Sequence, residues 1–162
     1  MKTAYLGLGS NVGNREANLR EALERLEAAG IRVTRRSSIY ETEPQGLRDQ
    51  PWFLNAVVEV ETDLLAPQLL ACMLAVEREM GRRRLAPNGP RNIDMDILFC
   101  GQSVIDAPEL QLPHPRIAQR RFVLEPLAEI APDLRHPVSG KTAREMLAAL
   151  ETQEVRRISI IL

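Results

Sequence analysis

Two aspartates stand two positions apart inside an apolar run, Pro90 to Cys100, and their types and spacing could do chemistry. The run predicts a β-strand, in which side chains alternate between the two faces. Asp94 and Asp96 then share one face, and the opposite, core-facing side takes Ile93, Met95, Ile97 and Phe99. Carboxylates held side by side repel each other, and a hard divalent cation with oxygen ligands relieves that repulsion. We therefore expect a magnesium site on this strand.

Arginines lie close to this strand in the sequence. Arg82, Arg83 and Arg84 form a run, and Arg91 stands three residues before the first aspartate. The intervening segment is rich in Gly, Pro and Asn, so it predicts a loop whose closure brings guanidinium groups onto a ligand at the metal. Guanidinium groups bind phosphate oxygens well. The combination indicates phosphoryl-type chemistry on a polyphosphate.

A second pair of residues lies on an earlier predicted strand. Its core face takes Leu54, Ala56, Val58 and Val60, so Phe53 and Asn55 fall together on the opposite face, which we expect to be exposed to solvent. A single exposed aromatic residue is common. An aromatic ring beside an amide on such a face is unusual, and it makes the pair a candidate for binding.

The elements that must position these residues follow from apolar periodicity. A strand at Ala4–Leu8 leaves through a glycine turn, a helix runs from the cap Asn14 to Gly30, and a strand covers positions 31–39. The strand with Phe53, a helix opened by Pro67 and ended by Gly81, and the aspartate strand complete the order βαββαβ. This order predicts an α+β fold: a ferredoxin-like core with helices packed on one face of an antiparallel sheet.

Further elements follow this core. We expect a helix at Phe122–Ile130, a final helix that begins at a Thr142–Glu145 capping box and runs through Leu150, and a last strand at Arg157–Leu162. The chain has 162 residues with 44% hydrophobic content, which predicts one domain, 1–162.

Composition narrows the class of protein. The net charge of −1 argues against a general nucleic-acid binder, and no apolar run approaches a membrane span or a signal sequence. Cys72 and Cys100 sit in apolar surroundings without ligand-like spacing, which favours reduced thiols. We expect a soluble, monomeric cytoplasmic enzyme that acts on small molecules and has neither nucleic-acid nor membrane partners.

Several motifs together resemble one family, the 6-hydroxymethyl-7,8-dihydropterin pyrophosphokinases of folate biosynthesis. The resemblance runs nearly end to end, except for about the last 25 residues. It rests on the order and spacing of these motifs: Gly9-Ser10-Asn11, Tyr40-Glu41-Thr42-Glu43-Pro44, Phe53-Leu54-Asn55-Ala56, Glu77 before Gly81-Arg82, Gly89-Pro90-Arg91 with Asp94-x-Asp96, Pro113-His114-Pro115 and Arg120-x-Phe122-Val123-Leu124.

The resemblance implies the reaction and the nucleotide site. Such enzymes transfer the pyrophosphoryl unit of ATP to the pterin hydroxymethyl oxygen and release AMP. Asp94 and Asp96 would hold two magnesium ions. Catalytic contacts to the transferring phosphates would come from Arg82 and Arg91, and further ATP contacts from Glu77, Arg84, the backbone around Ile97, His114 and Arg120.

The resemblance also implies the pterin site. Phe53 and Phe122 would sandwich the flat ring while Asn55 bonds its edge, which accounts for the aromatic–amide pair on one strand. The backbone of Thr42, Glu43, Pro44 and Gln45 would complete the hydrogen bonds. The sequence departs from better-known members at Leu74, Asn88, Glu109, Gln111 and Pro115, which affects substrate affinity and lid movement more than the class of reaction.

Two alternatives from other classes stay open at this level. Gly9-Ser10 with paired aspartates is similar to metal-dependent nucleotidyltransferases, although there the two motifs usually lie close in sequence. A ferredoxin-like sheet also serves as an RNA-recognition module, which needs exposed aromatics on central strands, and this chain has few aromatics. The products decide between the enzymes: pyrophosphoryl transfer releases AMP and nucleotidyl transfer releases pyrophosphate.

Overall fold

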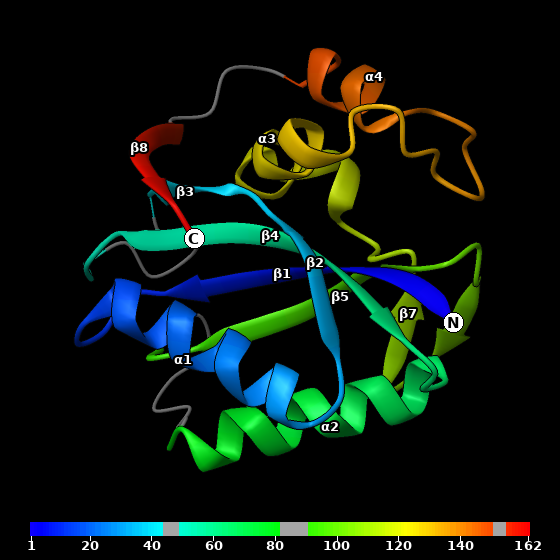
Figure 1. Ribbon diagram of the computed structural model, residues 1–162. Coiled ribbons are helices and arrows are strands. Elements are labelled where there is room, and N and C mark those ends of the chain that lie inside the picture. The colour runs from blue at the N-terminus through cyan, green and yellow to red at the C-terminus, as the bar shows by residue number, and fades with distance from the viewer. Residues whose placement is uncertain (44–48, 82–90, 151–154) are drawn as a thin grey trace.

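A six-stranded antiparallel sheet carries the candidate residues. The computed structural model describes residues 1–43, 49–81, 91–150 and 155–162. Within them the strand order is β5–β1–β4–β3–β8, and β2 also pairs with β4 (Figure 1). These strands are β1 (Lys2–Ser10), β2 (Arg32–Arg36), β3 (Ser38–Thr42), β4 (Phe53–Thr62), β5 (Asp94–Cys100) and β8 (Val155–Ile161). The predicted α+β fold with a βαββαβ core is confirmed.

Two helices cover one face of this sheet, α1 (Arg15–Ala28) and α2 (Ala66–Glu79). The predicted helix signals are confirmed: the Asn14 side chain accepts a hydrogen bond from the amide of Ala17 at 3.1 Å. Gly30 and Gly81 follow the two helices with φ of 88° and 75°, values that favour glycine. Among the described helices, none has the length and apolar character that a membrane crossing requires.

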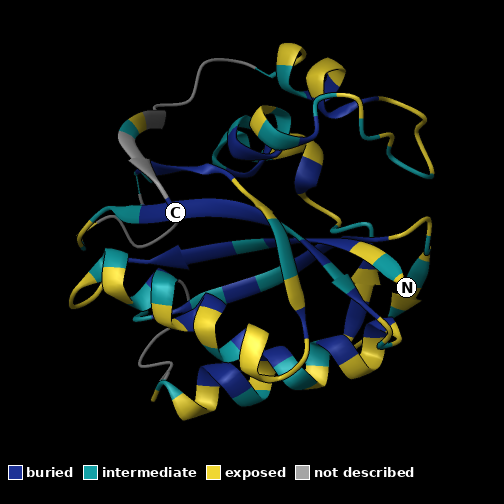
Figure 2. Cartoon of the chain, in the orientation of Figure 1, coloured by how far each residue is buried: buried dark blue, intermediate teal, exposed yellow. Residues whose placement is uncertain are grey.

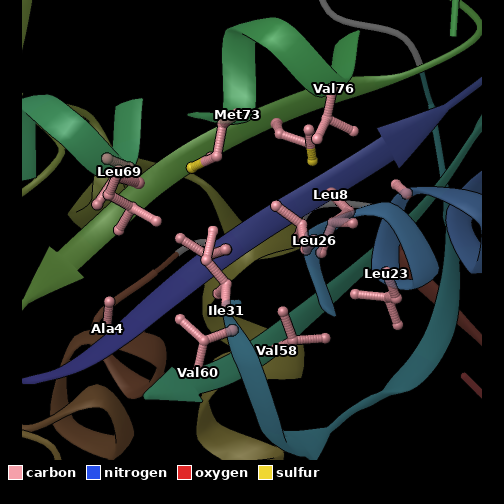
Figure 3. Packing of buried hydrophobic residues seen from close by; sticks show 14 of the residues in the cluster. Ala4, Leu8, Leu23, Leu26, Ile31, Val58, Val60, Leu69, Met73 and Val76 are labelled. Atoms are coloured by element: carbon pink, nitrogen blue, oxygen red, sulfur yellow. The ribbon is translucent and has the colours of Figure 1, made fainter. Parts of the chain in front are cut away.

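The first core lies between these helices and the sheet. Leu23 and Leu26 of α1 and Met73 and Val76 of α2 pack over the sheet, and Met95 belongs to the same cluster (Figure 3). Burial of these side chains is the main force that holds α1 and α2 against the sheet. It also fixes which face of β5 is left for the aspartates.

A second core covers part of the opposite face. Helices α3 (Arg121–Ile130) and α4 (Ala143–Ala148) lie across the sheet from α1 and α2 (Figure 1). Val57 of β4 is buried in this core, and Asn55 is only 8% exposed. The two helices of the predicted core do pack on one face, but the expectation that Asn55 faces solvent is wrong, because α3 and α4 cover part of the opposite face (Figure 2).

Strand irregularities correct three further expectations. Tyr5 of β1 pairs with Phe99 and Leu6 pairs with Ile97, so Leu98 is an extra residue in β5. This bulge turns Phe99 into the second core, not the first, and the predicted face of Phe99 is wrong. The predicted strand at positions 31–39 is two strands, β2 and β3, separated at Ser37. Strand β1 runs on through Gly9 to Ser10, whereas the predicted strand ended at Leu8 and passed into a turn.

The remaining elements flank the site. A hairpin of β6 (Ile105–Ala107) and β7 (Leu110–Leu112) follows β5, and a 3-10 turn at Ile117–Gln119 leads into α3. The capping box of α4 is confirmed, because Thr142 and Glu145 exchange hydrogen bonds at 3.0 and 3.1 Å. Helix α4 ends at Ala148, shorter than the predicted end at Leu150.

Candidate active site

The carboxylate strand lies beside two glycines. In the pairing of β1 with β5, Asp94 stands opposite Gly9 and Asp96 stands opposite Gly7. The side chains of Asp94 and Asp96 alternate with the core residues Met95 and Ile97, as predicted. Because the glycines place no side chain across from the carboxylates, open space adjoins both of them.

Arginines lie next to these carboxylates. Nη1 of Arg91 donates to Oδ2 of Asp94 at 2.9 Å, and both side chains are largely buried. The Nε of Arg91 is buried and has no hydrogen-bond partner among the described residues. A buried donor without a partner is costly, so this position suits an incoming anionic oxygen. Burial lowers the pKa of Arg120, whose charge also acts on Asp96 and Asp94.

The aromatic ring of Phe53 and the amide of Asn55 lie on β4, next to β3. Asn55 is opposite Tyr40, and Phe53 is opposite Thr42, in the pairing of β3 with β4. Nδ2 of Asn55 donates to Oγ1 of Thr42 at 2.5 Å, a buried contact that orients the amide. Phe122 lies at the start of α3, and the Arg120 guanidinium lies 5.4 Å from the centre of its ring.

One pocket joins the two groups. It is lined by residues of β1, β3, β4, β5 and α3, and it brings together nine predicted site residues: Thr42, Glu43, Phe53, Asn55, Arg91, Asp94, Asp96, Arg120 and Phe122. A surface for a flat ring therefore adjoins a surface of two carboxylates and two guanidinium groups. The arrangement can hold a planar heterocycle at one end and a polyphosphate at the other.

The donor set fits magnesium held jointly with a substrate. Mg²⁺ in proteins usually takes one or two carboxylates and completes its shell with water and substrate phosphates. The described residues contain no group of three or more His, Cys, Asp or Glu able to hold a metal ion. Asp94 and Asp96 therefore suit an ion that arrives with a phosphate better than one enclosed by protein alone.

His114 is not among the residues that line this pocket, although its imidazole interacts electrostatically with Arg120 and Asp94, which do. Its amide donates to the carbonyl of Leu98 at 3.0 Å, and its Nδ1 accepts from the amide of Arg116 at 3.2 Å. Burial, together with the charges of Arg120 and Arg116, lowers the pKa of His114 to about 4. The imidazole is therefore neutral near pH 7, with its proton on Nε2.

Comparison with known proteins identifies the family of this chain. Residues 5–132 match the family model described as 7,8-dihydro-6-hydroxymethylpterin-pyrophosphokinase (HPPK). A Methylorubrum extorquens protein named 2-amino-4-hydroxy-6-hydroxymethyldihydropteridine pyrophosphokinase is 47% identical over 159 residues, or 98% of this chain and 99% of that protein. The chain belongs to the HPPK family. The resemblance inferred from the motifs is confirmed.

Longer HPPK-related proteins also match. Folic acid synthesis protein fol1 of Pneumocystis carinii is 40% identical over 157 residues, which are 97% of this chain, and the chain spans 21% of that protein. A crystal structure of Plasmodium falciparum HPPK-DHPS has a TM-score of 0.74 at 17% identity, covering 91% of this chain and 45% of that chain. The latter likeness shows a shared HPPK fold.

Other predicted site residues lie elsewhere. Glu77 is buried on α2, where Oε2 accepts from the amide of Met95 at 2.9 Å, and Ile97 packs in the first core. Neither lines the pocket within the described residues. Pro44, Gln45, Arg82 and Arg84 lie outside the described residues, as does Asn88.

Asn11 is a residue whose role the sequence did not reveal. Its Oδ1 accepts from the amide of Arg91 at 2.7 Å, and its Nδ2 donates to the side chain of Gln50 at 2.9 Å and to the carbonyl of Pro51 at 3.0 Å. It is 1% exposed. The buried amide thus connects the segment before β4 to the segment before β5. Asn11 formed part of a recognised motif, but only tertiary structure shows its partners.

Proposed function

We propose that this chain transfers the pyrophosphoryl group of ATP to the hydroxymethyl oxygen of 6-hydroxymethyl-7,8-dihydropterin and releases AMP. As an HPPK family member it is an ATP-dependent pyrophosphokinase of folate synthesis. The observation that carries the assignment of residues is the single pocket that joins an aromatic–amide surface to paired carboxylates and arginines. The two ends of this pocket match the two substrates.

The pterin would lie between β4 and α3. Phe53 and Phe122 line the pocket from these two elements and offer ring faces for stacking. Asn55 and Thr42, which bond each other in the structure, would form further hydrogen bonds to the edge of the pterin. Glu43 lines the same end, and the neighbouring Pro44 and Gln45 remain predicted contacts.

The triphosphate would lie over β5. Asp94 and Asp96 would hold magnesium, for which we propose two ions; when bound, the metal neutralises phosphate charge and orients the phosphates for in-line attack. Arg91 would donate a hydrogen bond from its buried Nε to one phosphate oxygen, and Arg120 would bind another. His114 would act as a neutral donor through Nε2, and Glu77, Ile97, Arg82 and Arg84 remain predicted nucleotide contacts.

The products of a single mixture test the reaction. We expect the chain, MgATP and the pterin to give AMP and a pterin diphosphate in equal amounts. No AMP should form when the pterin is left out. Free pyrophosphate as the nucleotide-derived product would favour nucleotidyl transfer, and ADP would indicate an ordinary kinase; either result contradicts the proposal.

The carboxylate pair can be tested separately. Asp94→Asn and Asp96→Asn should each lower kcat by about 10³-fold or more, because each removes a metal ligand. Manganese binding in the presence of a non-hydrolysable ATP analogue should weaken in parallel. Asp106→Asn is the control, because Asp106 is an exposed residue of β6 whose side chain bonds Gln111 at 3.4 Å. A fully active Asp96→Asn would remove Asp96 from the metal site.

The protein's state in the cell belongs to the same proposal. We infer a monomeric cytoplasmic enzyme built from one domain, 1–162. The two cysteines are free, which suits a reducing compartment, and burial raises the pKa of both thiols, which makes them less reactive. Light scattering coupled to size exclusion should give one chain per particle at micromolar concentration. A dimer mass would contradict the monomer.

A further inference from the structure

The carboxyl end of α3 is attached to β3 by one side chain, Glu129. Its carboxylate accepts from the amide of Ser38 at 3.0 and 3.1 Å, from the Ser38 hydroxyl at 2.8 Å and from the Tyr40 hydroxyl at 2.8 Å. Arg157 of β8 adds an ion pair at 3.4 Å and donates to Ser38 Oγ at 2.8 Å. Three separate elements therefore meet at this carboxylate.

The donors around Glu129 are buried. Ser38 is 1% exposed and Tyr40 is 4% exposed, so both rely on the carboxylate for their hydrogen bonds. Burial, and then the hydrogen bond to Glu129, raises the pKa of Tyr40. Hydrogen bonds to a charged acceptor are stronger and more directional than neutral ones. The hydrogen bonds of Glu129 therefore fix the position of α3 relative to β3.

Glu129 meets β3 at one end of the packed pair α3 and β3, and the other end of this pair lines the pocket. Phe122 and Glu129 are seven residues apart on α3, about two helical turns and ~10 Å, so they share one face of the helix. Ser38, Tyr40 and Thr42 share one face of β3. Thr42 and Phe122 line the pocket at the near end, while Ser38 and Glu129 meet at the far end. Helix α3 packs along β3 and β4 over this length (Figure 1).

A second contact holds the same end of α3. Nη1 of Arg35 donates to the carbonyl of Ile130 at 2.8 Å, and its Nε lies 3.7 Å from the carboxylate of Glu59. The apolar contacts of Leu124 and Leu127 in the second core also hold the helix to the sheet. Loss of Glu129 should therefore shift or tilt α3 without detaching it.

We propose that Glu129 is a positioning residue for the pterin: it sets how far α3 stands from the sheet and so the width between Phe122 and Phe53. This inference rests on the proposed function, because it assigns that width to a bound pterin. Stacking needs ring faces within van der Waals distance on both sides, so a shift of about 1 Å at Phe122 weakens it strongly. The hydrogen bonds described for Glu129 go to β3 and β8, so Asp94 and Asp96 on β5 should keep their geometry.

The test separates the two substrates in one set of variants. Glu129→Ala should raise KM for the pterin about 10-fold or more, and Glu129→Gln, which keeps one acceptor oxygen, about 3-fold, while KM for ATP should rise clearly less, because Arg120 at the start of α3 is one proposed phosphate contact among several. Direct pterin binding, followed by its fluorescence, should weaken by the same factors. Glu125→Gln is the matched control, because Glu125 lies one turn earlier on α3 and pairs with Arg121 of the same helix at 3.1 Å.

Each result decides the inference. If Glu129→Ala is folded by circular dichroism but binds the pterin like the parent, or if both KM values rise equally, the inference is wrong. Should Glu129→Ala fail to fold, Tyr40→Phe and Ser38→Ala each remove one hydrogen bond to Glu129, the latter also the Arg157 contact to Ser38 Oγ, and must still raise the pterin KM by about 2- to 3-fold. If the parent chain itself does not convert the pterin, the proposed function has failed, which is a different outcome from an active parent with unaffected variants.

Discussion

At the scale of single residues, a missing side chain shapes the pocket as much as the side chains that are present. A Cβ added at Gly9 would lie 2.8 Å from Oδ1 of Asn55 and 3.4 Å from Cδ1 of Phe53. At Gly7 the nearest atom, from Leu98, would be 3.5 Å away, an ordinary contact. Gly9 therefore gives Asn55 the room that its orientation needs, whereas Gly7 has space for a methyl group.

This difference gives a matched pair of variants. Gly9→Ala should raise KM for the pterin about 10-fold or more, because the added methyl displaces the Asn55 amide. Gly7→Ala should change the same KM by less than about 3-fold. Steady-state kinetics with the pterin varied at saturating MgATP measure both. Equal pterin affinity in the Gly9→Ala variant and the parent would mean that the amide position does not depend on Gly9.

His114 gives a prediction on pH. Its pKa of about 4 in the folded chain lies below the value of about 6.5 expected when unfolded. As pH falls, the unfolded chain takes up this proton first, so the contribution of His114 to the free energy of unfolding decreases between about pH 6.5 and 4 and is constant outside that window. The decrease from this residue should be about 1–3 kcal/mol, allowing for its partial exposure.

Urea unfolding at several pH values measures this effect. The comparison is between the parent and His114→Asn, which cannot take up the proton. The difference between their free energies of unfolding should change across the window and stay constant above pH 7. A difference that does not vary with pH would show that His114 has an ordinary pKa in the folded chain.

Sequence alone located the residues whose environment is local. Asp94 and Asp96 were placed on one face by alternation within their own strand, and so were Phe53 and Asn55. The contributions of Gly9, Asn11 and Glu129 depend on partners far away in the sequence, such as Arg91 for Asn11. Periodicity carries no information about such partners, so these three residues needed the structure.

At the scale of elements, α2 supports the carboxylate strand through Glu77. Oε2 of Glu77 accepts from the amide of Met95, which lies between the two aspartates. Glu77→Ala should lower the free energy of unfolding by about 1–3 kcal/mol, because it leaves that buried amide without its acceptor. Thermal and urea unfolding measure the loss.

The control for this variant lies on the same helix. Glu79→Ala removes an exposed ion pair with Arg25 and should cost less than about 1 kcal/mol. The KM for ATP in the Glu77 variant tests the nucleotide contact that the family resemblance implies. A stable Glu77→Ala protein with a strongly raised KM for ATP would favour nucleotide binding over support of β5.

Element types and ends were predictable where a residue signals them chemically. Asn14, Gly30 and the Thr142–Glu145 box marked helix ends correctly. The bulge at Leu98 was not predictable, because an apolar run of this kind reads as regular alternation and gives no sign of an inserted residue. The separation of β2 from β3 at Ser37 was not predictable for the same reason.

At the scale of the whole molecule, one sheet separates two cores. The first core is formed with α1 and α2, and the second with α3 and α4. Because both use the same strands, we expect unfolding in a single cooperative transition, with equal calorimetric and van't Hoff enthalpies. Fluorescence of the single tryptophan, Trp52, should follow the same curve as far-ultraviolet circular dichroism. Two separated transitions would contradict one domain.

The ferredoxin-like core could be predicted from the order of its elements. The position of α3 and α4 could not, because they follow the core and their periodicity shows only that each has an apolar side. Their placement over Val57 turned a face predicted to be wet into the wall of a pocket. The candidate site was thus recognised by residue type before its enclosure could be known.

The carboxylate that braces β5 also bears on how the protein behaves at high concentration. Strand β5 ends the order of the described sheet, and its apolar sequence would make its outer edge a template for another extended chain. Oε2 of Glu77 accepts from the amide of Met95 near the start of β5, and the carbonyl of Leu98 farther along accepts from the amide of His114. Edge-to-edge pairing through the strand that carries Asp94 and Asp96 is therefore opposed by neighbours in the fold, and the two half-buried aspartates themselves stay within reach of solvent.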